Sequence, residues 1–402
     1  MIYDFTIVGA GIIGLSTAYK LSLAYPDASI LVLEKEDEIA THQTGNNSGV
    51  IHSGIYYKPN SYRAKNCVDG RHQLVDFCEN NGVDYDICGK VIVATEENEL
   101  PALHKIFETG KINEIEGIEK IDRQELAEIE PYVDGLEAIH VPCAGIVDYV
   151  GVCKKLRDII EQGNTEVMCG TAVRNIRHDR ENDFVIVDSD HEQFKTNYLI
   201  NCAGLYSDHV AESAGIQNEI QIVPFRGEYF ELTAEAEHMV NGLIYPTPNP
   251  AFPFLGVHFT KMVQGNVECG PNAVFAFKRE GYDKFSFDLQ ETIETVNFPG
   301  FWKLAKKHWR MGLDEYYRSI SKKAFVEGLQ KLIPSIQASD LKPAPAGVRA
   351  MALTPEGEIV DDFKFAATGR EIHVLNAPSP AATAGLAIGD EIVSKASEAF
   401  AL

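Results

Sequence analysis

Residues 4–34 read DFTIVGAGIIGLSTAYKLSLAYPDASILVLE, and this segment predicts the architecture of the N-terminal part of the chain. An apolar run at residues 5–8 predicts a strand that leads directly into the loop GAGIIG, residues 9–14. Small and apolar residues at helical spacing follow, and a second apolar strand, residues 30–33, ends at Glu34. This order of strand, glycine loop, helix, strand and acid is typical of a βαβ unit that binds a dinucleotide.

Each part of this unit has a physical reason. Gly9 permits the tight turn, and Gly11 lets backbone N–H groups approach a pyrophosphate. Gly14 lets the helix pack closely on the strand, and the positive end of the helix dipole attracts the phosphates. Glu34 lies 25 residues after Gly9, where its carboxylate can accept hydrogen bonds from the ribose hydroxyls of an adenosine.

The glycine loop does not by itself distinguish FAD from NAD. Its position at the N-terminus, and the lack of a second glycine loop after a strand, favour FAD that a substrate reduces directly. A NAD-dependent dehydrogenase is the alternative.

The bulk composition narrows the class of protein. A chain of 402 residues usually forms two domains, and a net charge of −23 argues against a nucleic-acid partner. The eight cysteines form no CxxC pair, so no metal centre or disulfide framework is expected. The chain shows neither a signal-peptide pattern nor an apolar run near the roughly 20 residues of a membrane-spanning helix, so we expect a cytoplasmic protein.

The pattern beyond residue 60 predicts an α/β fold with a discontinuous, Rossmann-like FAD-binding domain and an inserted, mainly antiparallel α+β substrate domain. Residues 96–131 are charged and predict helix, whereas aromatic runs such as IQIVPFRGEYFEL at residues 220–232 predict strands. Small residues near the C-terminus predict a helix that begins near Ala381, either approaching the flavin with its positive end or forming an apolar C-terminal helix without a ligand. We place the FAD-binding domain at residues 1–82, 144–215 and 346–402, and the substrate domain at residues 83–143 and 216–345.

Several longer motifs resemble a known family. GAGIIG, NNSGVIHSGIYY, NCAG, PFLGVHFT, GPNAVFAFKREGY, GVRA and APSPAAT follow one another in this order along the chain. The sequence is similar, from residue 2 to about residue 390, to the L-2-hydroxyglutarate oxidase/dehydrogenase family of the D-amino-acid-oxidase-like FAD superfamily. The resemblance implies a non-covalently bound FAD that oxidises L-2-hydroxyglutarate to 2-oxoglutarate by hydride transfer. Electrons would then pass to a quinone, oxygen or another acceptor.

The loop TGNNSGVIHSGIYYKP, residues 44–59, mixes polar turn formers with apolar residues ten positions after Glu34. Its hydroxyl, amide and backbone N–H groups suit a pyrophosphate or ribityl chain. The segment YLINCAGLYSD, residues 198–208, reads as a strand that turns at Ala203–Gly204, either beside the FAD or as an ordinary strand-to-helix turn. The residues expected to contact the cofactor are Gly9, Gly11, Ile13, Gly14, Glu34, Lys35, Thr44, Asn46, Asn47, Ser48, Gly49, Val50, Val173, Ala203, Gly204, Pro380, Ala381, Ala382 and Thr383.

Oxidation of a 2-hydroxy acid requires a base for the hydroxyl proton. Histidine suits this role because its pKa lies near neutral pH, and His52 and His258 are the two catalytic candidates. A histidine in an apolar strand such as that around residue 258 is otherwise commonly a buried structural residue. The sequence does not decide which of the two is the base.

The substrate carboxylate requires a cation. Arg349 follows a proline and a glycine in PAPAGVRAMALTPEG, and its planar fork matches a carboxylate, although a surface ion pair would explain it equally well. The family resemblance favours the substrate role for Arg349. Tyr57 and Asn272 are further candidates for substrate contacts, and Arg226 is expected to support the flavin or the pocket wall.

Residues 298–325, FPGFWKLAKKHWRMGLDEYYRSISKKAF, form a basic aromatic segment in an acidic chain. The segment holds seven Lys or Arg residues against two acids, together with both tryptophans of the chain. This composition favours an amphipathic helix at the surface of the inner (cytoplasmic) membrane, where the protein would be peripheral and would meet a membrane quinone. The alternative is a solvated helix whose tryptophans pack on the protein.

Three alternatives to the main function remain at the level of sequence. A related FAD enzyme could act on another 2-hydroxy acid, glycerol 3-phosphate or an amino acid. The chain could also be a flavin-binding redox module without turnover, or a NAD-dependent dehydrogenase. The oligomeric state, the electron acceptor and the stereochemistry do not follow from the residues.

Overall fold

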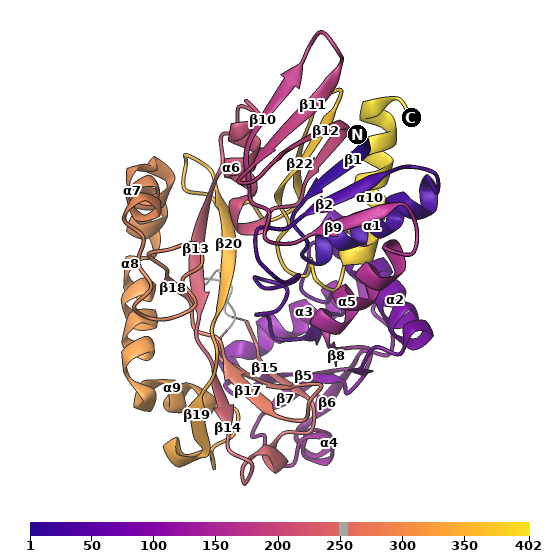
Figure 1. Ribbon diagram of the computed structural model, residues 1–402. Helices are drawn as coiled ribbons and strands as arrows, with labels where there is room; N and C mark the ends of the chain where they lie inside the picture. The colour runs from indigo at the N-terminus through magenta and orange to yellow at the C-terminus, as the bar shows by residue number, and fades with distance from the viewer. Residues whose placement is uncertain (249–255) are drawn as a thin grey trace.

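The computed structural model describes residues 1–248 and 256–402, and within these ranges an eight-stranded sheet contains the N-terminal unit (Figure 1). The sheet consists of β1 (Tyr3–Val8), β2 (Ile30–Leu33), β9 (Thr165–Met168), β10 (Val173–Asp179), β11 (Phe184–Ser189), β12 (Gln193–Asn201), β21 (Lys364–Ala367) and β22 (Glu371–Asn376). β1 lies between β2 and β12 and is parallel to both. β9 and β22 extend the parallel part on either side. The predicted Rossmann-like unit is therefore present.

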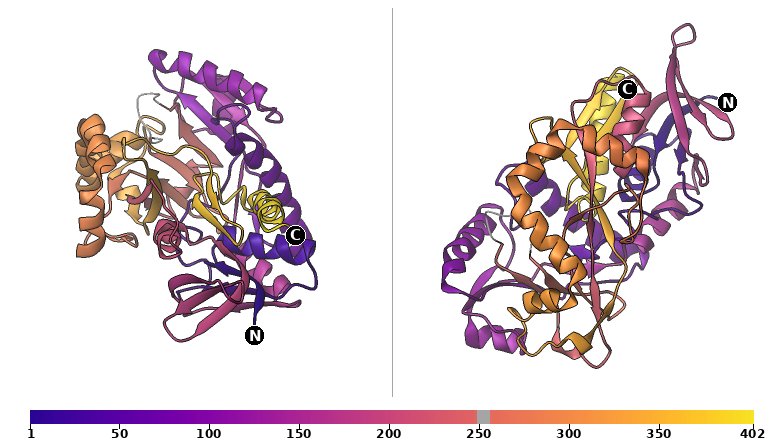
Figure 2. Two further views of the ribbon diagram at one scale, coloured as in Figure 1. Left: turned by 90° about the horizontal axis from the view of Figure 1, so that it is seen from above. Right: turned by 90° about the vertical axis from the view of Figure 1, so that its left-hand side faces the viewer.

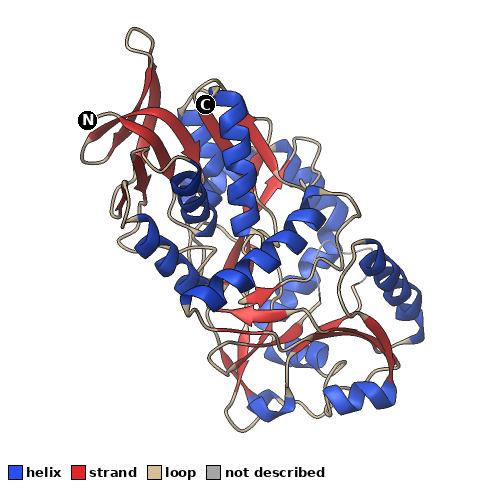
Figure 3. Ribbon diagram, turned by 90° about the vertical axis from the view of Figure 1, so that its right-hand side faces the viewer, coloured by secondary structure: helices blue, strands red, loops and turns tan. Residues whose placement is uncertain are grey.

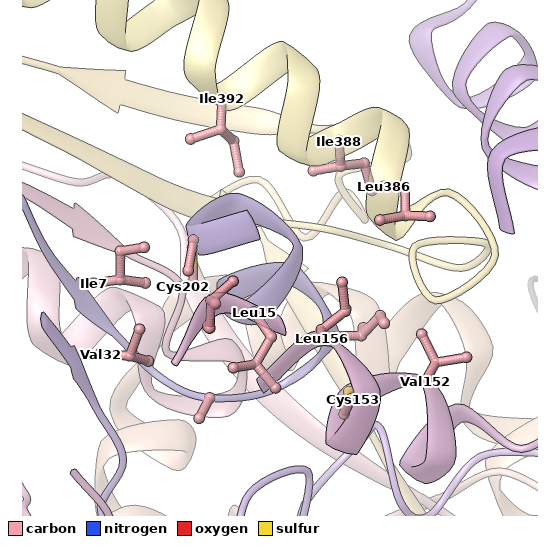
Figure 4. Close-up of a cluster of buried hydrophobic side chains, with 14 of the residues drawn as sticks. Ile7, Leu15, Val32, Val152, Cys153, Leu156, Cys202, Leu386, Ile388 and Ile392 are labelled. Atoms are coloured by element: carbon pink, nitrogen blue, oxygen red, sulfur yellow. The ribbon is translucent and has the colours of Figure 1, made fainter. Parts of the chain in front are cut away.

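Helices cover this sheet and bury an apolar core. They are α1 (Ile12–Ala24), α2 (Tyr62–Asn81), α5 (Tyr149–Ile160), α6 (Ser207–Ser213) and α10 (Gly385–Phe400). Figure 4 shows Leu15 of α1 between Ile7 of the sheet and Ile388 of α10, and Figure 3 shows these helices from outside. Burial of each such side chain contributes about 1.5–3 kcal/mol relative to exposure.

Small residues hold the last helix close to the first. A Cβ at Gly385 would lie 2.8 Å from Ile12 Cγ1, and a Cβ at Gly389 would lie 2.9 Å from the backbone oxygen of Ser16. The helix was predicted to begin near Ala381, which is wrong, because turns occupy residues 381–384 and α10 begins at Gly385. The small residues within this helix thus serve helix packing.

A second eight-stranded sheet and two three-stranded sheets lie in the described part of the chain. Apart from the parallel pair of β5 and β15, the large sheet is antiparallel. Its strands are β19 (Leu341–Pro343), β14 (Phe230–Leu232), β17 (Val267–Gly270), β16 (His258–Lys261), β15 (Leu243–Pro246), β5 (Lys90–Ala94), β7 (Glu137–Val141) and β6 (Glu119–Asp122). The small sheets are β18 (Val274–Phe275), β13 (Gln221–Gly227) and β20 (Gly347–Leu353), and β3 (Val50–Ile51), β8 (Gly145–Val147) and β4 (Tyr85–Asp86).

The remaining helices lie at the outside of the second region. They are α3 (Leu100–Ile112), α4 (Arg123–Ile129), α7 (Leu289–Asn297), α8 (Pro299–Ile320) and α9 (Lys322–Leu329), with short 3₁₀ helices η1 (Glu97–Glu99), η2 (Gly204–Tyr206), η3 (Glu237–Met239) and η4 (Ala338–Asp340). α7, α8 and α9 form the side of the molecule that faces the viewer in the right-hand panel of Figure 2. The prediction that residues 96–131 are all helical is wrong, because β6 lies between α3 and α4 and pairs with β7.

The predicted fold class is confirmed: an α/β unit is combined with a mainly antiparallel region. The domain boundaries stay a prediction. One pairing crosses the predicted division, since β20 begins at Gly347 in the proposed FAD-binding domain and pairs along its length with β13 of the proposed substrate domain. β13 and β20 thus link the two regions as one antiparallel pair.

Candidate active site

A cavity of about 1890 Å³ extends from the glycine loop of the Rossmann-like unit to the β13–β20 pair and β16. It is larger than the roughly 300–1,000 Å³ of an ordinary small-molecule pocket, so it has room for a long ligand and a second, small one. Most of the predicted site residues line it. Those on its wall are Gly9, Gly11, Ile13, Glu34, Lys35, Thr44, Asn46, Asn47, Ser48, Val50, His52, Tyr57, Val173, Ala203, Gly204, His258, Arg349, Pro380, Ala381 and Ala382.

The glycine loop forms one end of this cavity. Gly9 has φ +100°, a left-handed conformation that favours glycine, and a Cβ there would lie 2.6 Å from the backbone oxygen of Cys202. A Cβ at Gly14 would lie 1.9 Å from the oxygen of Gly9. Gly14 is therefore not on the cavity wall but holds α1 against the loop. Thr44 Oγ1 accepts a hydrogen bond from the Ile12 N–H at 3.1 Å and fixes the following loop to the start of the helix.

Glu34 lies at the end of β2 and is 8% exposed. Its carboxylate accepts hydrogen bonds from the N–H groups of Ala10 (2.8 Å) and Glu36 (3.1 Å), one on each oxygen. Each oxygen of a carboxylate has two acceptor positions, so both retain one for a ligand. Lys35 also lines the cavity, but its ammonium is bound by the carboxylates of Glu36 and Glu280.

The loop that follows Thr44 is braced by its own asparagines. Asn46 donates to the backbone oxygens of Thr41 and His42, and Asn47 donates to those of Gln43 and Thr44. The Asn47 side-chain oxygen also accepts the Gly49 N–H at 2.7 Å, and Gly49 has φ +63° and lies off the wall. These amides therefore shape the loop from within, while its residues line the cavity.

The C-terminal turn also contributes to the cavity wall. Pro380, Ala381 and Ala382 line it, whereas Thr383 lies behind the wall and is fully buried. Thr383 Oγ1 accepts the His52 N–H at 3.1 Å, contacts the backbone oxygen of Val50 at 3.2 Å, and lies 2.9 Å from the Tyr149 hydroxyl. This side chain therefore fixes the segment that carries His52 to the start of α10.

His258 is oriented by two contacts. Its Nδ1 lies 2.9 Å from the backbone oxygen of Gly256, which makes Nδ1 the protonated nitrogen and leaves Nε2 as the acceptor. Its ring stacks on Tyr245, with centroids 3.9 Å apart. Burial, together with the positive charges of Lys90 and Arg349, lowers the pKa of His258 to about 3. The imidazole is therefore neutral and can accept a proton.

His52 lies in the same part of the cavity and is half-buried. Burial is the largest cause that holds its pKa well below the ordinary value, and the positive charges of Lys90 and Arg63 act in the same direction. Tyr57 lines the cavity beside it and stacks under the Arg63 guanidinium at 4.6 Å. Both predicted histidines are thus neutral groups in one place.

Arg349 lies near the start of β20 and is half-buried at the cavity wall. Its Nη1 lies 3.5 Å from the backbone oxygen of Asn272. The Asn272 side chain does not line the cavity, because its amide donates to Glu228 Oε2 and its oxygen accepts the Glu228 N–H. Arg226 likewise bonds Glu228 and the backbone oxygen of Asp283. Contact of Asn272 with substrate stays a prediction, and Arg226 belongs to this supporting network.

Sequence reasoning missed several residues at this end of the cavity. Tyr245 and Tyr229 line it, and Lys90 is 2% exposed with its ammonium 4.2 Å from the centre of the Tyr245 ring. A signal for Lys90 was available, since a lysine that opens the apolar run KVIVA, residues 90–94, indicates a buried charge. Residues 254 and 255 of the apolar segment around His258 lie outside the described residues.

The arrangement agrees with comparison to known proteins. The family model described as FAD dependent oxidoreductase matches residues 4–395. The chain belongs to the FAD-dependent oxidoreductase family. Its cofactor is therefore FAD, and the NAD alternative is wrong.

Two relatives align with all or nearly all of the length of this FAD-dependent oxidoreductase. It is 48% identical over 401 residues to the L-2-hydroxyglutarate dehydrogenase of Indibacter alkaliphilus, with 100% of each chain covered. It is 45% identical over 393 residues to the L-2-hydroxyglutarate dehydrogenase of Escherichia coli strain K12, with 98% and 93% covered. The resemblance stated from the sequence motifs is confirmed.

A solved structure shares the fold of this FAD-dependent oxidoreductase. The L-alpha-glycerophosphate oxidase of Mycoplasma pneumoniae, solved with FAD bound, has a TM-score of 0.81 at 23% identity and covers 100% of this chain and 95% of its own. The residues present fit the cofactor. The backbone at Gly9 and Gly11, which carry no Cβ and line the cavity, would hold the pyrophosphate, and the remaining acceptor positions of Glu34 would hold the ribose.

Proposed function

We propose that this FAD-dependent oxidoreductase oxidises L-2-hydroxyglutarate to 2-oxoglutarate. The observation that carries the proposal is that a neutral, oriented imidazole, His258, and the Arg349 cation line the same cavity. This cavity begins at the dinucleotide loop. A 2-hydroxy acid offers a hydroxyl proton to the first group and a carboxylate to the second. The identity of 48% to a full-length L-2-hydroxyglutarate dehydrogenase supports this substrate.

The chemistry divides between the cofactor and the residues of the chain. FAD, when bound, accepts the hydride from the carbon that bears the hydroxyl group. Arg349 holds the adjacent carboxylate, and His258 Nε2 takes the hydroxyl proton as the carbon–oxygen bond becomes a carbonyl. His52, fixed at its backbone by Thr383, orients the substrate.

His258 is the better candidate for the base because its tautomer is set. The bond from Nδ1 to the Gly256 oxygen directs the lone pair to Nε2, and the stack on Tyr245 fixes the ring plane. A base with a pKa of about 3 is weak in the free enzyme. A dianionic substrate offsets the cationic charges of Lys90 and Arg349, and so raises the basicity of His258 when the proton moves.

Anaerobic reduction of the purified holoenzyme tests the substrate. L-2-hydroxyglutarate should bleach the flavin absorbance within seconds, while D-2-hydroxyglutarate, malate, glycerol 3-phosphate and amino acids should react far more slowly. Faster bleaching by one of the other compounds would replace the proposed substrate. Protein that keeps its colour with every compound would instead support a flavin-binding redox module without turnover.

We further propose that electrons leave to a quinone at an anionic membrane surface that α8 contacts. No helix in the described ranges is long and apolar enough to cross a membrane. On α8, Trp302 and Trp309 are 57% and 55% exposed, and Lys306, Lys307 and Arg310 lie beside them in exposed positions. Aromatic side chains at headgroup level and cations facing anionic lipid are the features of a helix that lies on a membrane.

The same helix also reaches the cavity. Leu304, Lys307 and His308 line it, and α8 departs from helical geometry at His308, with φ −120°. A ligand from the membrane surface would therefore meet the cavity along α8. This supports a lipid-soluble acceptor over a soluble one.

Sedimentation with vesicles tests the membrane contact. Replacement of Lys306, Lys307 and Arg310 by Glu should abolish binding to vesicles that contain anionic lipid, and added salt should weaken binding of the unchanged protein. The matched control replaces three exposed lysines away from α8, Lys65, Lys154 and Lys331, by Glu. It alters the net charge by the same amount as the first variant and should leave vesicle binding intact. Equal loss in both variants, or no loss in the first, would refute contact through α8.

A further inference from the structure

Lys90 is a buried cation without an acidic partner. It opens β5 and is 2% exposed, and its ammonium has no hydrogen bond or salt bridge to any residue within the described ranges. Its ammonium instead lies 4.2 Å from the ring centre of Tyr245 and 5.5 Å from that of Tyr56. Burial lowers the pKa of Lys90 to about 8, and among the described residues the thiols of Cys67, Cys143 and Cys88 oppose this effect. A buried charge left in this state requires compensation by a ligand.

The tertiary structure places Lys90 beside the reacting end of the cavity, which is the end lined by His52, His258 and Arg349. Lys90 itself is not on the cavity wall, but Tyr245 and Tyr56, whose rings lie against its ammonium, both line the cavity. The charge of Lys90 acts on both His52 and His258, and lowers the pKa of each. Lys90 therefore lies within electrostatic reach of the two residues that meet the substrate.

A second donor without a partner in the described residues belongs to Tyr56, which lines the same cavity. The Tyr56 hydroxyl is buried and has no hydrogen-bond partner in the described part of the chain. Buried hydroxyls are almost always hydrogen-bonded, so a hydroxyl and an ammonium that both lack a partner within the described residues indicate that an acceptor binds at this end of the cavity. A carboxylate is the acceptor that satisfies both an ammonium and a hydroxyl.

We propose that Lys90 and Tyr56 bind the second carboxylate of the substrate and so select dicarboxylic over monocarboxylic 2-hydroxy acids. The proposal rests on the proposed function, in which Arg349 holds the carboxylate next to the reacting carbon. The charges that act on His258 are both cationic, Lys90 and Arg349, and a dianion compensates both at once. Lys90 is thus a specificity-determining residue, whereas His258 takes the proton.

Two substrates that differ only at the end remote from the hydroxyl group test this assignment. The holoenzyme is reduced anaerobically by L-2-hydroxyglutarate and by L-2-hydroxypentanoate, in which a methyl group replaces the second carboxylate. Lys90→Met should lower kcat/KM for the dicarboxylate by about 10- to 100-fold, the loss expected for a hydrogen bond to a charged group, and should leave that for the monocarboxylate unchanged or raised. Tyr56→Phe should lower the same preference about 10-fold.

Binding without reaction provides a second readout. Glutarate and pentanoate, which lack the hydroxyl, are titrated while the flavin absorbance spectrum is recorded. The unchanged enzyme should bind glutarate more tightly than pentanoate, and Lys90→Met should remove the difference. Lys90→Arg retains the charge and should keep most of the preference, which controls for a loss of packing.

The outcomes separate the two proposals. If Lys90→Met slows both substrates equally, or keeps its preference for the dicarboxylate, the assignment of Lys90 is refuted. If the unchanged enzyme is reduced by neither 2-hydroxy acid, the proposed function fails, whatever the variants do. Because methionine removes an unpaired buried charge, Lys90→Met should melt at or above the temperature of the unchanged holoenzyme, and retained flavin absorbance confirms that it is folded.

Discussion

Replacement of His258 by asparagine removes the base while keeping the bond that orients it. The Asn side-chain nitrogen occupies the position of Nδ1, so it can still donate to the Gly256 oxygen, which lies 2.9 Å from Nδ1. Nothing then occupies the position of Nε2. The rate of anaerobic flavin reduction at saturating L-2-hydroxyglutarate should fall by about 10²- to 10⁴-fold, the usual contribution of a general base. This corresponds to about 3–5 kcal/mol of transition-state free energy.

The stability cost of this change should be small by comparison. The stack of His258 on Tyr245, at 3.9 Å between ring centres, contributes about 0.5–1.5 kcal/mol. A protein of ordinary stability, about 5–15 kcal/mol, remains folded after this loss. Stopped-flow absorbance measures the reduction rate, and urea unfolding followed by circular dichroism measures the stability. The two effects are therefore separable.

The matched control is His52→Asn. Because His52 orients the substrate, this change should raise KM and slow reduction less than His258→Asn does. A reduction rate of His258→Asn within about threefold of the unchanged enzyme, or a larger loss in His52→Asn, would assign the proton transfer to His52 and refute the reasoning from the tautomer.

The pH profile of the unchanged enzyme provides an independent check. A pKa of about 3 keeps His258 deprotonated until the pH falls close to that value. The profile of kcat/KM, which reports the free enzyme, should therefore show no loss from this histidine between about pH 5 and pH 8. An acidic limb near the ordinary histidine pKa, absent in His258→Asn, would show that burial does not lower the pKa of this residue.

Three further changes test the cofactor loop, the carboxylate site and the support of His52. Gly14→Ala forces a Cβ to within 1.9 Å of the Gly9 oxygen, and should lower the free energy of unfolding by about 1–3 kcal/mol. It should also remove most of the bound FAD, which the ratio of visible to ultraviolet absorbance measures. The control is Gly312→Ala, whose Cβ meets nothing within 4 Å and which should change neither quantity. Arg349→Lys loses the planar fork and should raise KM about 10- to 100-fold with a smaller change in kcat; an unchanged KM would exclude Arg349 from carboxylate binding. Thr383→Val leaves the His52 N–H unpaired and should destabilise the protein by about 1–3 kcal/mol in urea unfolding, while Thr383→Ser, which keeps the hydroxyl, should not.

The cofactor unit could be predicted because its residues act over short distances. The strand, the glycine loop and Glu34 lie within residues 4–34, and backbone geometry alone brings the loop, the helix start and the acid together. The structure places all of these where the pattern predicts, with Gly9 at φ +100° and Glu34 on the cavity wall. Gly14 packs α1 closely, as predicted, but it does not line the cavity, so its contact with the cofactor stays a prediction.

The residues at the reacting end of the cavity could be predicted only in part. Histidine and arginine were chosen by their chemistry, and the structure brings His52, His258 and Arg349 to one cavity. Asn272 was a weaker candidate in the sequence, and in the structure Glu228, 44 positions away in the chain, forms hydrogen bonds with its side chain. Side-chain partners at such separations leave no pattern in a single sequence.

The surroundings of Lys90 depend on strand pairing, whereas the cofactor unit depends on local spacing in the sequence. Local spacing specifies a βαβ unit and long motifs specify a family, so the residues alone predict a dinucleotide-binding α/β protein of the FAD-dependent oxidoreductase family. The position of Lys90 against Tyr245 and near His258 follows instead from the fold, through the pairing of β5 with β15 and of β15 with β16. Strand pairing brings together residues that are distant in the chain, and burial then removes the water and counter-ions that would otherwise hide an unpaired charge.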